Sequence, residues 1–101
     1  MRVVIWTARA SRDFNSQLEY IARDSSQNAE LMRERVLATA THLAEFSTGR
    51  PGRVLGTYEA VVPKTSLILA YKLGGNDMLQ ILRLIHGARD WRPGKWPMET
   101  G

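Results

Sequence analysis

The fold is decided by residues 66–86, SLILAYKLGGNDMLQILRLIH. Two runs rich in leucine and isoleucine, 66–73 and 78–86, lie on either side of the segment 74–77, GGND. Apolar runs of this length are typical of strands, and a short connection rich in glycine and asparagine favours an antiparallel hairpin. The sequence therefore predicts two paired strands here.

A third strand is predicted before this hairpin. Residues 54–62 form another run enriched in valine, and the short segment 63–65, PKT, separates it from the hairpin. Further upstream, residues 47–52, STGRPG, contain two glycines and a proline, which are the strongest breakers of regular structure. We expect an antiparallel meander after this break.

Two helices are predicted before the break. In the first, Thr7 can cap the N-terminus, and apolar residues recur every three or four positions at Ala10, Phe14, Leu18 and Ile21. In the second, the same spacing runs to about residue 46, at Ala29, Met32, Val36, Ala40, Leu43 and Phe46. Residues 24–28, DSSQN, interrupt the pattern, and Asp24 or Ser25 can cap the second helix. The two helices indicate an αα-hairpin, each burying one face.

The first residues, Arg2 to Thr7, are rich in β-branched and aromatic side chains and predict a short strand. A strand, two helices and three strands in this order predict an α+β fold, with the helical hairpin packed on a small antiparallel β-sheet. We expect one domain over residues 1–91, because 101 residues are close to the commonest domain size, and an irregular tail over residues 92–101.

The composition excludes several classes of protein. The chain has no cysteine, which excludes a disulfide framework and the usual zinc sites. The two histidines, His42 and His86, are far apart, so neither a metal site nor a cofactor is predicted. No stretch approaches the ~18 apolar residues of a membrane span, and no signal peptide is evident. We expect a soluble cytoplasmic protein with no membrane partner.

The positive charge is concentrated in one half of the chain. Residues 1–49 carry six basic and six acidic side chains, whereas residues 50–101 carry eight basic and four acidic ones. The whole net charge of +4 therefore lies in the second half. Such a distribution favours an anionic partner, either a nucleic acid or an acidic protein segment.

Two motifs in the second half resemble a known family. Residues 49–62, GRPGRVLGTYEAVV, are similar to the connection and following strand of ParE toxins, and residues 81–91, ILRLIHGARDW, to their last strand and its exit. Residues 5–7, IWT, also match. The chain thus resembles the ParE branch of the RelE/ParE superfamily of type II toxins, over about residues 3–91. Departures are Tyr58, where arginine is frequent, and residues 92–101.

The resemblance implies a toxin that binds DNA gyrase, stabilises its cleaved-DNA complex and has no catalytic residue of its own. Toxins of this kind serve in plasmid stabilization. The residues that we expect to contact the target lie near the end of the sheet and are Arg83, His86, Arg89 and Trp91.

The resemblance also implies a cognate antitoxin, ParD-like or of another class, with a segment that folds on binding. Operator DNA would be reached only through the antitoxin complex. A basic surface attracts an acidic disordered segment, and a groove between the hairpin and the sheet offers apolar anchoring sites. The residues expected to bind it are Arg50, Arg53, Leu67, Leu69 and Tyr71.

Two other functions stay open. RelE-type members cut messenger RNA on the ribosome, which implies an arginine on the middle strand, another on the last strand and a nearby tyrosine or histidine. Here the middle-strand position falls on or near Ile68, so only Arg83, His86 and Tyr71 could serve. Residues three apart in a strand point to opposite faces, and Tyr71 lies in a largely apolar strand where a core role is more usual, so the set is incomplete. The third possibility is a non-toxic remnant that binds only its antitoxin.

Overall fold

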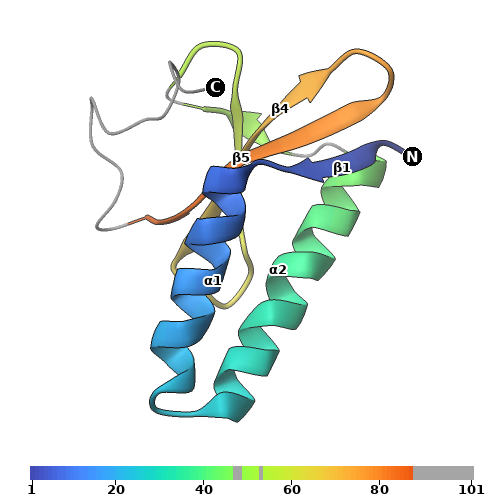
Figure 1. Cartoon of the computed structure of the whole chain (residues 1–101). Helices are drawn as coiled ribbons and strands as arrows, with labels where there is room; N and C mark the ends of the chain where they lie inside the picture. The colour runs from blue at the N-terminus through green and yellow to red at the C-terminus, as the bar shows by residue number, and fades with distance from the viewer. Residues whose placement is uncertain (47–48, 53, 88–101) are drawn as a thin grey trace.

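The computed structural model describes residues 1–46, 49–52 and 54–87. Two helices lie side by side against one face of a five-stranded sheet (Figure 1). The elements are β1 (Val3–Trp6), α1 (Ala8–Ala22), α2 (Ser26–Phe46), β2 (Arg50–Pro51), β3 (Tyr58–Val61), β4 (Leu67–Gly74) and β5 (Met78–His86). The predicted α+β class is confirmed.

Side chains just before each helix cap it, as the sequence indicates. The Thr7 hydroxyl accepts a hydrogen bond from the N–H of Ala10 at 3.1 Å and donates one to the carbonyl of Leu82 at 3.2 Å. The Ser25 hydroxyl accepts from the N–H of Asn28 at 3.1 Å, so Ser25 caps α2. Thr7 therefore fixes both the start of α1 and its position beside β5.

The sheet is mixed, which corrects the prediction of an antiparallel sheet. Its strand order is β1-β5-β4-β3-β2, and β1 runs parallel to β5. The antiparallel prediction holds for β2 to β5. No short turn joins β1 to its neighbour, so local turn chemistry does not fix the direction of that pair.

The strand predicted over residues 54–62 is shorter than expected. Its first part is a turn, in which the N–H of Thr57 donates to the carbonyl of Val54 at 3.0 Å and Gly56 has a φ of 87°. Glycine adopts this positive φ without steric cost. Before the turn, Pro51 lies in the two-residue edge strand β2, where a missing N–H is tolerated.

The core fills the space between the helices and the sheet. Trp6 of β1 stacks on Phe14 of α1 with ring centroids 5.2 Å apart. The buried cluster consists of Ala10, Val36, Ala40, Leu43, Val62, Leu67, Leu69, Tyr71, Leu79, Ile81 and Leu84. Within the described ranges, neither helix combines the length and apolarity needed to cross a membrane.

Candidate functional site

Arg83, which we expected on the target-binding surface, is only 7% exposed. Its Nε donates to Oδ2 of Asp13 at 2.7 Å, and its Nη2 donates to Oδ1 at 3.1 Å. The backbone N–H of Leu84 donates to the same carboxylate at 3.1 Å. A paired arginine of this kind joins α1 to β5. The structure thus gives Arg83 a packing role in place of the exposed role that we expected.

His86 lies at the end of β5 and does not meet Arg83. A bulge at Leu82 interrupts the pairing of β4 with β5, and the register is regular from Arg83 onward. Successive side chains in a regular strand point to opposite faces, so Arg83 and His86 lie on different faces. The bulge falls too early in the strand to bring them together.

Tyr71 is fully buried and belongs to the core, and its contact with an antitoxin stays a prediction. Its hydroxyl accepts a hydrogen bond from the N–H of Gly49 at 3.0 Å, and its ring stacks on Tyr58 at 5.6 Å. A Cβ at position 49 would collide with this hydroxyl, so the close approach requires glycine. Tyr71 holds the connection after α2 against the sheet.

The other predicted antitoxin residues have mixed positions. Leu67 is 2% exposed and Leu69 is fully buried, because both face the helices, and their contact with an antitoxin stays a prediction. Arg50 is exposed on the edge strand β2. Arg53, the fifth predicted antitoxin residue, lies outside the described part of the chain, and so do the predicted target residues Arg89 and Trp91.

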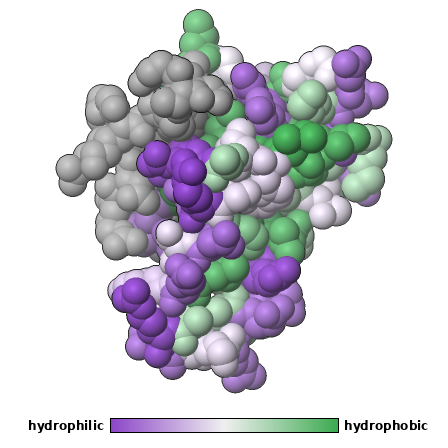
Figure 2. All heavy atoms as spheres, viewed as in Figure 1, coloured by the Kyte–Doolittle hydropathy of each residue, from purple (hydrophilic) through white to green (hydrophobic). Residues whose placement is uncertain are grey.

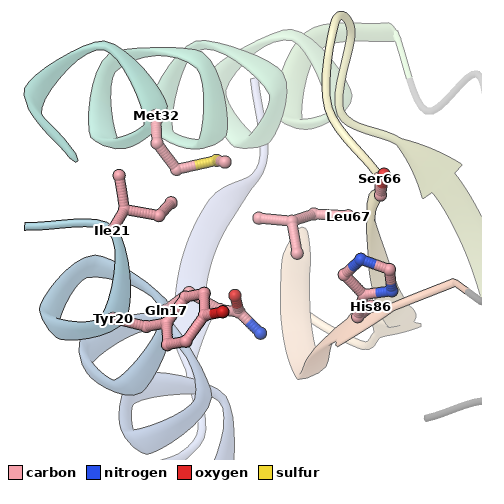
Figure 3. A pocket seen from close by; sticks show the side chains of 7 residues that line it. All are labelled: Gln17, Tyr20, Ile21, Met32, Ser66, Leu67 and His86. Atoms are coloured by element: carbon pink, nitrogen blue, oxygen red, sulfur yellow. The ribbon is translucent and has the colours of Figure 1, made fainter. Parts of the chain in front are cut away.

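A hollow of about 390 Å³ opens between the helical hairpin and the ends of β4 and β5. Figure 3 shows residues of both helices on one wall and residues of the sheet on the other. The lining residues are Gln17, Tyr20, Ile21, Met32, Ser66, Leu67 and His86. Of the predicted site residues that the structure describes, the hollow brings together Leu67 and His86 alone.

The lining favours binding of an apolar side chain over catalysis on a phosphate. Ile21, Met32 and Leu67 provide apolar surface, and Tyr20 is 61% exposed. Among the described residues that line the hollow, none is Asp, Glu, Lys or Arg. Pockets of this composition bind ligands mainly through apolar contact, with a few polar groups that fix orientation.

Sequence reasoning missed Asp13 and most of this lining. Asp13 lies four residues after Arg9, which is the usual spacing of a surface ion pair on a helix, and the Arg9 Nε lies 3.7 Å from the Asp13 Oδ1. Ile21 and Met32 belong to the periodic apolar faces and were assigned to the core. The exposed aromatic Tyr20 was the available indication of a contact surface, since such residues are enriched at interfaces.

The comparisons with known proteins agree with this architecture. The family model described as "ParE toxin of type II toxin-antitoxin system, parDE" matches residues 4–91. The chain belongs to the ParE toxin family.

A curated relative of this ParE-family toxin is "Putative toxin Y4kP" of Sinorhizobium fredii (strain NBRC 101917 / NGR234). It is 31% identical over 87 residues, which cover 85% of this chain and 88% of the relative. Among solved structures, one described as "Chromosomal ParDE TA system from P. aeruginosa" superposes with a TM-score of 0.76. At 20% identity, covering 85% of this chain and 96% of the other, that likeness shows the fold.

Proposed function

We propose that this ParE-family toxin inhibits DNA gyrase by binding to it and stabilising its cleaved-DNA complex. The supporting observation is that the described residues do not assemble a ribonuclease site. RNA cleavage needs a base, an acid and cations around one phosphate. Arg83 is instead bound to Asp13, and the Tyr71 hydroxyl is bound to Gly49. Ile68 supplies no charge at the middle-strand position.

We further propose that a cognate antitoxin neutralises the toxin in the cytoplasm by placing an apolar side chain in the hollow beside Tyr20 and His86. The supporting observation is the hollow itself, whose lining is largely apolar and includes the exposed Tyr20. The net charge of +4, all of it in residues 50–101, favours an acidic antitoxin segment, whose attraction would fall with salt. Operator DNA would be contacted through the antitoxin in this complex.

Expression in a bacterial host tests the target. Inhibition of gyrase predicts filamentous cells with DNA-damage signalling, and rescue when the product of the neighbouring gene is expressed as well. Arrested translation with cut transcripts would instead support a RelE-like ribonuclease. Normal growth would support a non-toxic remnant. Either of these two results would overturn the proposal.

A further inference from the structure

The edge strand β1 is apolar, and none of the described strands pairs with its outer margin. It forms one margin of the sheet, and its sequence, VVIW, contains neither a charge nor a proline. Val3 is 59% exposed and Ile5 is 41% exposed. Figure 2 shows hydrophobic residues gathered at this end of the molecule. Natural sheets usually protect such edges with charges, prolines or a covering element, because an open edge pairs readily with another strand.

The backbone of β1 has hydrogen-bonding groups directed outward. The N–H of Val3 donates to the carbonyl of Asp77, in the turn before β5, at 2.7 Å, and the N–H of Thr7 donates to the carbonyl of Ile81, in β5, at 3.1 Å. These groups alternate in direction along a strand. The N–H groups of Val4 and Trp6 therefore face the outer margin of the sheet.

The position of Arg2 limits the pairing segment. Its N–H donates to the carbonyl of Ala44, in α2, at 2.9 Å. Pairing at the open margin is consequently restricted to Val4 through Trp6. Ile5 is the midpoint of this segment.

We propose that β1 pairs antiparallel with β1 of a second copy of the chain, about a two-fold axis at Ile5. Val4 of each copy then exchanges two hydrogen bonds with Trp6 of the other, and the two sheets become continuous. The two Ile5 residues form a non-hydrogen-bonded pair, in which the Cα atoms are about 4.5 Å apart. The contact covers the exposed Val3 and Ile5 side chains of both copies.

The surroundings of β1 favour a second copy over an acidic segment. The charges on the residues that precede the strand or bond to its backbone are balanced: Arg2 is positive, and Asp77, whose carbonyl accepts from the N–H of Val3, is negative. Such a surface neither attracts an acidic chain strongly nor repels its own copy.

The helical layer adds apolar surface beside the same edge. Phe46, at the end of α2, is 61% exposed and lies two residues after Ala44, which contacts Arg2. A stable interface buries about 800 Å² per partner, more than so short a strand pair provides alone. The proposed contact therefore includes the end of α2 as well as β1.

A single introduced cysteine tests the register. The chain has no cysteine, so Ile5→Cys can form a disulfide only between copies. A non-hydrogen-bonded pair has the Cα separation that a disulfide requires. Mild oxidation of the full chain without antitoxin should cross-link Ile5→Cys at micromolar concentration, and cross-link the control Val61→Cys, 55% exposed on β3, far less. Equal cross-linking of the two variants would overturn the proposal.

Sedimentation equilibrium gives an independent measurement. The natural chain should be a dimer, and Ile5→Lys should weaken dimerisation at least about tenfold, because like charges meet at the axis. Val61→Lys should not change dimerisation, and circular dichroism checks that both variants are folded. A natural chain that is monomeric up to submillimolar concentration would overturn the proposal. So would protection of the Val4 and Trp6 N–H groups from hydrogen exchange only after antitoxin is added, because the edge would then receive a partner strand.

Discussion

Removal of the Asp13 carboxylate tests the contact that joins α1 to β5. This carboxylate accepts three hydrogen bonds, two from Arg83 and one from the N–H of Leu84, at 2.7–3.1 Å. The side chains of Arg83 and Asp13 are 9% and 13% exposed. Asp13→Ala would leave the arginine charge and the Leu84 N–H without this acceptor.

The burial of the pair sets the size of the effect. Loss of one partner of a buried ion pair costs about 3–5 kcal/mol, whereas an exposed pair contributes about 0–1 kcal/mol. We therefore expect Asp13→Ala to lower the free energy of unfolding by about 3–4 kcal/mol. This is a large part of the ~5–15 kcal/mol typical of a domain. Asp13→Asn, which keeps one acceptor oxygen, should cost less, about 1–3 kcal/mol.

Urea unfolding followed by circular dichroism measures these differences. Arg9→Ala is the matched control, because Arg9 contacts the same carboxylate at 3.7 Å with a half-exposed side chain, and its loss should cost under about 0.5 kcal/mol. The double variant Asp13→Leu with Arg83→Met should recover part of the loss. If Asp13→Ala lowered the free energy of unfolding no more than Arg9→Ala does, the contact between Asp13 and Arg83 would not stabilise the packing of α1 on β5.

Three further predictions concern single side chains. Tyr71→Phe removes the acceptor of the Gly49 N–H and should lower the free energy of unfolding by about 1–2 kcal/mol in the same urea assay; no change would show that this bond is not stabilising. Thr7→Ala removes the N-cap of α1 and should also cost about 1–2 kcal/mol, measured by thermal unfolding, unless another group caps the helix. Tyr20→Ala should weaken antitoxin binding at least about tenfold in calorimetric titration, whereas Leu55→Ala, 98% exposed elsewhere, should not; equal effects would argue against the hollow as the antitoxin site.

Periodicity predicted the helices and most of the strands because burial of one face imposes it on the sequence. Thr7 and Ser25 mark the starts of the helices because each side chain accepts a hydrogen bond from an N–H of the first helical turn. The direction of β1 depends on which strand it meets after folding. No residue within β1 encodes that choice.

The site was less predictable than the fold. Leu67, Leu69 and Tyr71 were predicted as antitoxin contacts, but the sequence does not show that the helices cover the face on which they lie. Arg83 was expected at the target-binding surface because arginine often dominates interfaces, whereas its partner in the structure, Asp13, lies 70 positions away in the sequence. Contacts of this kind depend on the packing of α1 against β5, which the sequence does not display.

A supercoiling assay with purified gyrase, run beside an in vitro translation assay, distinguishes inhibition of gyrase from cleavage of messenger RNA. We expect the toxin to block supercoiling and to cause broken DNA to accumulate, translation to continue, and the antitoxin to reverse the block. Unchanged supercoiling together with cleaved messenger RNA would contradict this expectation.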